Sequence, residues 1–159
     1  MNKNQQEQLD HLKSMVSQSA VDFLNKFCEY LANQNPKYNW VGIYVLRNGK
    51  LFLESFKGKP TIHTEINLGD GLCSMAILKN SIINEPDVNS NSEYLACSLE
   101  TKSELVIPIR MKDRPIGEID IDSDTKNAFT HKDEDFLSEA AKTIEFFVAH
   151  LSDINDIKA

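Results

Sequence analysis

The stretch at residues 68–109, LGDGLCSMAILKNSIINEPDVNSNSEYLACSLETKSELVIPI, decides how the chain is organised. It begins with Gly69 and Gly71, which relax the backbone on either side of Asp70 and predict a helix with an open N-terminus. Such a terminus favours anions or polarised oxygens. The backbone amides expected to point outward there are those of Ser74, Met75 and Ala76.

The second part of this stretch, residues 85–101, has no apolar periodicity and is expected to be a long loop. A loop of this length in a compact domain is usually functional or disordered. A run inside it favours a binding loop, namely Tyr94, Leu95, Ala96 and Cys97. The helix start and the loop together predict a ligand pocket.

The composition of the 159 residues, 41% hydrophobic and 26% charged, predicts one globular domain over residues 1–159 with a core at about 20–151. A net charge of -7 argues against nucleic acid or an anionic membrane as the main partner, because both select basic surfaces. The chain shows neither a signal-peptide pattern nor an apolar run that could span a membrane. We therefore expect a cytoplasmic protein that binds a small molecule or a protein.

The three cysteines are too few for a structural disulfide framework in a reducing compartment, so any disulfide would be transient. Cys28 shares a helical face with Leu24 and Leu31, which predicts a buried structural thiol. The four histidines show no spacing that pairs with the cysteines. Neither a metal site nor a cofactor is expected.

Hydrophobic periodicity predicts an α+β domain built on a mainly antiparallel sheet. Helices are expected near 5–33, with an interruption at 17–19, and at 72–79 and 131–151. Extended segments are expected at 38–47, 50–56, 61–66, 82–83, 104–110 and 115–122. The first and last helices should pack together on one face of the sheet, which leaves the other face for the pocket.

Asp120 and Asp122 alternate with two isoleucines along a strand, so both carboxylates lie on one face. Glu104 begins the neighbouring strand, and three acids around one cavity could hold an ammonium group. The alternative for this face is simple solvation. Trp40 and Tyr44 also share a face and could form the wall of an apolar cavity, although aromatic residues at such positions are more often part of the core.

Seven motifs follow one another along the chain: NWVGIY (39–44), FKGKP (56–60), GDGLC (69–73), EPDV (85–88), LAC (95–97), SELVIPI (103–109) and GEIDIDS (117–123). In this order they resemble the free methionine-R-sulfoxide reductases, which are single GAF domains. The resemblance covers roughly residues 39–137. It implies a six-stranded antiparallel sheet with helices behind it and a buried ligand cavity between the sheet and the loop.

The resemblance also implies roles for individual residues. Cys97 would attack the sulfoxide sulfur, and Cys73 would close a disulfide that thioredoxin reduces. The residues that would hold the substrate ammonium are Glu104, Asp120 and Asp122. Trp40 and Tyr44 would surround the methyl end of the substrate.

Several pocket positions depart from the pattern of the reductases. His63 stands where the family has the first of its three cysteines, and Asn89 replaces a histidine. Where the reductases usually have GHIACD, this chain has EYLACS at residues 93–98. Ser74 and Met75 stand where the reductases have a small Gly-Thr pair. Because the strands keep their pattern, these changes are expected of a domain that retained ligand binding after its chemistry changed.

The departures favour a second group that resembles the reductases, the staphylococcal nitrate receptors, which are stand-alone GAF proteins that act with a sensor kinase and its response regulator. We therefore expect a small-oxyanion receptor rather than an enzyme, with the reductase as the alternative. Nitrate would lie at the N-terminus of the helix that starts near Cys73, bonded by amides there and near Leu95 and Ala96. The expected walls are Trp40, Leu68, Met75 and Tyr94. The three acids would repel nitrate unless they are paired, protonated or directed elsewhere.

Overall fold

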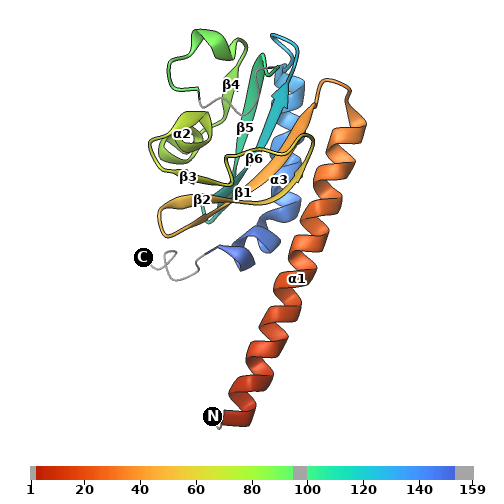
Figure 1. Ribbon diagram of the computed structural model, residues 1–159, viewed down its shortest axis with the longest axis vertical. Coiled ribbons are helices and arrows are strands. Elements are labelled where there is room, and N and C mark those ends of the chain that lie inside the picture. Colours follow the sequence, from red (N-terminus) through yellow and green to blue (C-terminus); the bar gives the residue numbers. More distant parts are fainter. Residues whose placement is uncertain (1–2, 95–99, 153–159) are drawn as a thin grey trace.

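The protein is described by a computed structural model that covers residues 3–94 and 100–152. Its elements follow in the order α1 (Lys3–Gln34), β1 (Trp40–Arg47), β2 (Lys50–Lys57), β3 (Glu65–Asn67), α2 (Gly71–Lys79), β4 (Ile83–Glu85), the 3-10 helix η1 (Val88–Ser90), β5 (Ser103–Met111), β6 (Arg114–Ser123) and α3 (His131–Leu151). The strands form one six-stranded sheet in the order β3-β2-β1-β6-β5-β4, and every neighbouring pair is antiparallel (Figure 1). The predicted α+β class and sheet are confirmed.

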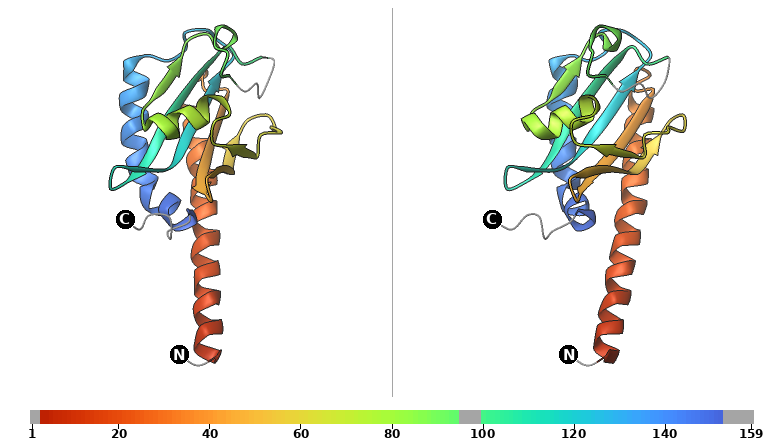
Figure 2. Two further views of the ribbon diagram at one scale, coloured as in Figure 1. Left: turned by 90° about the vertical axis from the view of Figure 1, so that its left-hand side faces the viewer. Right: turned by 60° about the vertical axis from the view of Figure 1, so that its left-hand side comes forward.

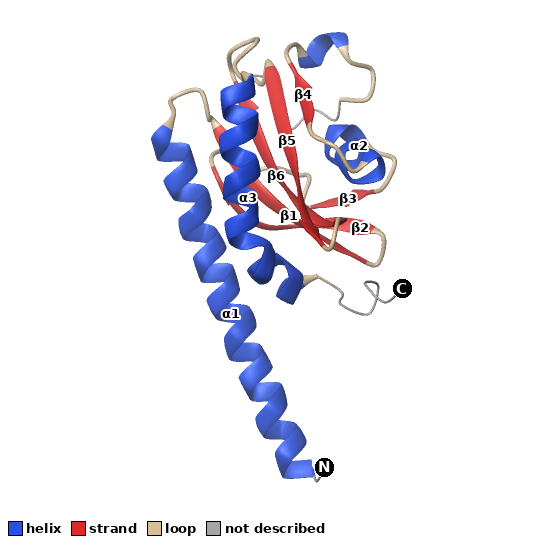
Figure 3. Ribbon diagram, turned by 180° about the vertical axis from the view of Figure 1, so that it is seen from behind, coloured by secondary structure: helices blue, strands red, loops and turns tan. Residues whose placement is uncertain are grey.

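Helices α1 and α3 pack together on one face of the sheet, as predicted (Figure 3). Alternate residues of β1, β5 and β6 point toward these helices and form the main hydrophobic core. Phe23 of α1 stacks on Phe147 of α3 with ring centroids 4.4 Å apart. Cys28 lies fully buried in this core, where the sequence predicted a structural thiol.

Helix α1 is continuous, so the predicted interruption at residues 17–19 is wrong. Ser17, Gln18 and Ser19 interrupt the apolar stripe but remove no backbone hydrogen bond, because only proline lacks the amide that a helix needs. The buried face of α1 begins at Ala20, and the preceding turns extend beyond the sheet (Figures 1 and 2).

Helix α2 covers the opposite face of the sheet and encloses a second, smaller apolar cluster (Figure 2). A bulge at Glu54 of β2, between the partners of Ile43 and Tyr44, shifts the register of β1 with β2 near this cluster. The long loop predicted at residues 85–101 contains the 3-10 helix η1, which the Asp87 side chain caps by accepting a hydrogen bond from the amide of Asn89. Among the described residues, no helix is both long and apolar enough to cross a membrane.

Candidate functional site

The face of β6 opposite the helices carries a row of acidic side chains. Ile119 and Ile121 point into the main core, whereas Glu118, Asp120 and Asp122 point toward α2. All three carboxyl groups are buried, with exposed fractions of 0%, 0% and 3%. The strand alternation predicted that Asp120 and Asp122 share a face, and the structure places them there.

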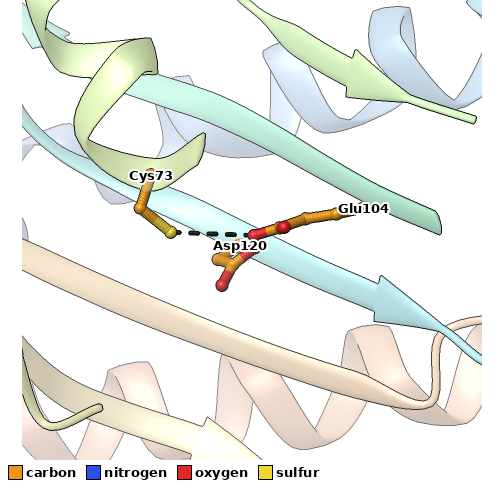
Figure 4. A group of neighbouring side chains, drawn as sticks. All are labelled: Cys73, Glu104 and Asp120. Atoms are coloured by element: carbon orange, nitrogen blue, oxygen red, sulfur yellow. Dashed lines mark hydrogen bonds between the residues drawn. The ribbon is translucent and has the colours of Figure 1, made fainter. Parts of the chain in front are cut away.

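Helix α2 brings a thiol to this row of acids (Figure 4). Glu104 on β5 is the cross-strand partner of Asp122, and Asp120 is the next acid along β6. The Cys73 Sγ lies 3.8 Å from Glu104 Oε1, and one ligand atom each from Cys73, Glu104 and Asp120 lies within 4.8 Å of the others. Helix α2 and the hairpin of β5 and β6 therefore meet at one buried polar cluster.

Burial controls the charge state of this cluster. Loss of water raises the pKa of Glu118, Asp120 and Asp122, and neighbouring carboxylates raise the pKa of Glu118 and Asp122 further. Contacts with Glu104 and Cys73 offset part of the rise at Asp120. The pKa of Cys73 lies well above its ordinary value, mainly through burial and then through the charges of the acids. The resting site therefore favours protonated acids and a neutral thiol.

These carboxyl groups have few internal partners. Neither oxygen of Glu118 or Asp120 has a hydrogen-bond partner of good geometry within residues 3–94 and 100–152. One oxygen of Asp122, Oδ1, likewise lacks a hydrogen-bond partner of good geometry among these residues. No lysine, arginine or histidine of these residues forms an ion pair with the three acids. A cationic group that entered the site would satisfy them.

Trp40 forms an aromatic wall beside the acids. Its indole lies over Gly42, where an added Cβ would come within 2.2 Å of the ring. The indole stacks on Phe56 with centroids 5.9 Å apart, and its Nε1 donates to the Lys59 carbonyl at 3.0 Å. Tyr44 lies 6.4 Å from Trp40 between centroids, and its hydroxyl donates to the His63 carbonyl at 2.7 Å. Both aromatic residues are held in fixed positions on the pocket face.

A cavity of about 210 Å³ opens between Trp40 and Asp122 at one end of β1 and β6. Lys59, Glu100 and Thr101 form part of its rim. Cys73, Glu104 and Asp120 are buried and are not among the residues that line this opening. The cavity is large enough for a small amino acid, and Asp122 of the acidic row forms part of its lining.

The start of α2 differs from the predicted anion site. The helix begins at Gly71 with Asp70 as its N-cap, so the amides of Ser74, Met75 and Ala76 fall within the hydrogen-bonded turns. The Ser74 hydroxyl is buried and accepts a hydrogen bond from the Gly69 amide. Met75 is half-buried and is not part of the cluster under α2.

The other predicted site residues are distributed as follows. Leu68, Cys73, Ala76 and Tyr94 pack into the cluster under α2 with Trp40 and Tyr44. Leu95, Ala96 and Cys97 lie outside the described residues. Glu118 was missed, although the GEIDIDS motif places it two residues before Asp120 and therefore on the same face.

The curled antiparallel sheet, its paired terminal helices and the helix α2 on the opposite face are those of a domain of the GAF type, and residues 15–147 match the family model described as "GAF domain". The chain is 33% identical to protein YtsP of Bacillus subtilis over 90% of each chain. It is 34% identical to the free methionine-R-sulfoxide reductase of Escherichia coli over 70% of this chain and 67% of that enzyme. The solved type II free methionine-R-sulfoxide reductase of Thermoplasma acidophilum is 54% identical, with a TM-score of 0.83 over 84% of this chain and 95% of that one.

The chain belongs to the GAF domain family, in the group that includes the free methionine-R-sulfoxide reductases. The resemblance inferred from the seven motifs is confirmed.

The expectation of a nitrate receptor acting with a sensor kinase is wrong. The named relatives and solved structures include reductases from several organisms, and their identity to this chain reaches 54%. The site gives the physical reason, because its buried acids oppose an anion and the amides at Ser74, Met75 and Ala76 are engaged within α2. The relatives support an enzyme, contrary to the preference for a receptor without catalytic activity.

Proposed function

We propose that this protein reduces free methionine-R-sulfoxide to methionine. The observation that carries the proposal is the meeting of Cys73 with Glu104 and Asp120 under α2, in a chain 54% identical to a type II reductase. A redox-capable thiol and a receptor for an ammonium group are the two parts that the reaction requires.

The acids would recognise the substrate by charge, because a bound ammonium group favours their ionised form. The ammonium group of a free amino acid would bind at Glu104, Asp120 and Asp122, where it would supply the hydrogen-bond donors that Asp120 and Asp122 lack. A methionine residue inside a peptide has no such group at its α-nitrogen. The site therefore selects the free amino acid over the peptide-bound form.

The aromatic wall recognises the other end of the substrate. Trp40 and Tyr44 would pack against the methyl group and polarisable sulfur of the sulfoxide. The indole occupies the space that side chains at Gly42 and Gly58 would need, so the two glycines allow this wall to pack directly against the backbone.

The chemistry follows the reversible steps of cysteine oxidation. The Cys97 thiolate would attack the sulfoxide sulfur, the oxygen would pass to Cys97 as a sulfenic acid, and methionine would leave after protonation. Cys73 would then attack the sulfenic sulfur, so that water leaves and a Cys73–Cys97 disulfide forms. A thioredoxin-type dithiol would reduce the disulfide and complete the two-electron cycle.

The raised pKa of Cys73 suits the resolving step. A neutral thiol does not compete for the sulfoxide while the substrate is intact. The neighbouring carboxylates provide bases that can accept its proton when it attacks the sulfenic acid.

The proposal is tested by coupling turnover to NADPH through thioredoxin and thioredoxin reductase. Free L-methionine-R-sulfoxide should be reduced, whereas the S epimer and a sulfoxide blocked at its amino group should be inert. Cys97→Ser and Cys73→Ser should each abolish thioredoxin-linked turnover, and Cys28→Ser should retain it. Equal rates on the free and the blocked sulfoxide would contradict the proposed role of the acids.

A further inference from the structure

The cluster of Cys73, Glu104 and Asp120 has a composition that an ammonium group alone does not explain. An ammonium uses oxygen acceptors and gains little from a sulfur ligand. Here one sulfur and two carboxyl groups converge from α2, β5 and β6, with ligand atoms within 4.8 Å of one another (Figure 4). The group is fully enclosed, with exposed fractions of 5%, 4% and 0%.

We propose that these three side chains also form a binding site for a zinc ion, which competes with the substrate and holds the reductase inactive. The proposal that zinc binds rests on the structure alone, whereas the proposal that zinc inhibits rests on the proposed function. A zinc site at these residues departs from the sequence-based expectation of no metal, which considered only combinations of cysteine with histidine.

The donor set favours zinc among the common cations. A thiolate is a soft ligand that magnesium and calcium avoid, whereas zinc accepts one thiolate together with carboxylate oxygens. Three protein ligands with a water in the fourth position are the usual arrangement of an open zinc site. Ligand atoms around such an ion lie about 3.5 Å apart, so the three side chains would need to draw together only slightly.

The second observation is the state of Asp120. Its side chain is fully buried and points into the cluster, and neither of its oxygens has a hydrogen-bond partner of good geometry in the described parts of the chain. A buried carboxyl in this state is costly unless a ligand satisfies it. A zinc ion bound between Asp120 and Cys73 would satisfy this acid and at the same time displace the proton of the thiol.

The position of the cluster bears on how a bound ion would act. Asp120, Glu104 and Cys73 are buried on the face of the sheet that α2 covers, where the substrate ammonium is proposed to bind. The bound ion would occupy the position of the substrate ammonium and withhold Cys73 from disulfide formation.

The binding test uses the full chain, reduced and stripped of metal with a chelator. Zinc is titrated by calorimetry, and cobalt is added separately because a cobalt–thiolate bond gives a strong charge-transfer absorption. We expect one ion per chain and a thiolate band. Cys73→Ser, Glu104→Gln and Asp120→Asn should each lower the zinc affinity by about tenfold or more, since loss of outer contacts alone costs that much.

Two controls separate the site from general effects. Cys28→Ser removes a buried thiol elsewhere, and Glu139→Gln removes an exposed carboxylate of α3. Both should bind zinc like the unmodified chain. Circular dichroism establishes that each variant is folded. Unchanged zinc binding by folded Cys73→Ser, or no cobalt–thiolate band in the unmodified chain, would overturn the proposal.

The inhibitory part is tested by competition. Free L-methionine-R-sulfoxide should weaken zinc binding, and zinc should inhibit turnover until a chelator is added. If zinc binds through Cys73 and the sulfoxide does not change the zinc affinity, the proposed competition is wrong. If zinc binds through Cys73 but no sulfoxide is ever reduced, the metal site stands and the proposed reductase function fails.

Discussion

Glu104 on β5 and Asp122 on β6 are direct cross-strand partners, and both carboxyl groups are buried. Two negative charges at this spacing in a low dielectric oppose each other, so the native state disfavours ionisation of both acids together. The arrangement lowers the stability of the folded protein, and under the proposed function the same acids bind the ammonium of the substrate. Stability and substrate affinity should therefore respond in opposite directions when one acid is neutralised.

Asp122→Asn should make the protein more stable above about pH 5. The pKa of Asp122 is raised in the folded state, mainly by burial and then by Asp120 and Asp124, so the native protein binds this proton more tightly than the unfolded chain. The stabilisation from protonated Asp122 is therefore fully present below its pKa in the unfolded chain, about 3.9. It is lost as the pH rises through its pKa in the folded protein. The advantage of the variant should grow by up to about 1.4 kcal/mol per pH unit across this window, as measured by urea unfolding from pH 4 to 8.

Glu118→Gln is the matched variant, because it removes another buried carboxyl with a raised pKa from the same strand face. It should show the same pH-dependent gain in stability. The proposed substrate site includes Asp122 but not Glu118, so only Asp122→Asn should lower sulfoxide affinity, by about tenfold or more for a lost charge-assisted bond. An equal loss of affinity in both variants would show that the ammonium lies deeper in the pocket.

Gly42→Ala should displace the indole that forms the aromatic wall. A Cβ at this position would lie 2.2 Å from the Trp40 ring, and Gly58 blocks a shift toward the other side. We expect a loss of about 1–3 kcal/mol in stability from overpacking and at least a tenfold rise in KM for the sulfoxide. Steady-state kinetics and thermal unfolding measure the two effects.

Gly49→Ala serves as the control for the previous variant. Gly49 has a φ of +72° and no neighbour within 4 Å of an added Cβ, so the change strains the β1–β2 turn without touching the pocket. It should lower stability while KM stays the same. A raised KM in Gly49→Ala would mean that the sheet transmits strain to the site.

Cys28 should resist thiol reagents in the native protein at pH 8. Burial in the core between the helices and the sheet raises its pKa to about 12, so the thiolate is almost absent. Mass spectrometry after maleimide treatment should find Cys28 modified only when denaturant is present. Modification of Cys28 before the other cysteines would contradict its position in the core.

Thr130→Ala should lower stability by about 1 kcal/mol. The Thr130 hydroxyl accepts a hydrogen bond from the Lys132 amide, and the Asp133 side chain accepts one from the Thr130 amide, which completes a capping box at the start of α3. Thr143→Ala is the control, since Thr143 is an exposed residue inside the same helix. Its effect in urea unfolding should stay within about 0.5 kcal/mol.

Periodicity predicted most of the fold because the strands and helices repeat their burial pattern locally. The alternation in β6 and the face of α3 can be read from a few neighbouring residues. The continuity of α1 could not be predicted from the apolar stripe, because a polar interruption of the stripe does not break the backbone. The buried face of α1 begins at Ala20, whereas the apolar residues before it lie on the part of the helix that extends beyond the sheet.

The alternation of apolar and polar residues predicted that Asp120 and Asp122 share a face of β6 and that Trp40 and Tyr44 share a face of β1, and the structure has both pairs on the face that α2 covers. The distance from Cys73 to Glu104 depends on how α2 packs across β5 and β6, which no local pattern records. The prediction of a nitrate receptor is wrong because it depends on single departures such as His63 and Asn89, whereas the chain as a whole is 54% identical to a type II reductase.

The strict alternation of β6 also bears on how the chain avoids misfolding. A slip of one residue against β1 or β5 would turn Glu118, Asp120 and Asp122 into the apolar layer beneath α1 and α3 and expose Ile119 and Ile121. Three carboxyl groups in that layer would cost several kcal/mol, so the mispaired sheet would not persist. The three acids of β6, two of which are proposed to bind the ammonium, thus penalise the wrong pairing of this central strand during folding, before any substrate is present.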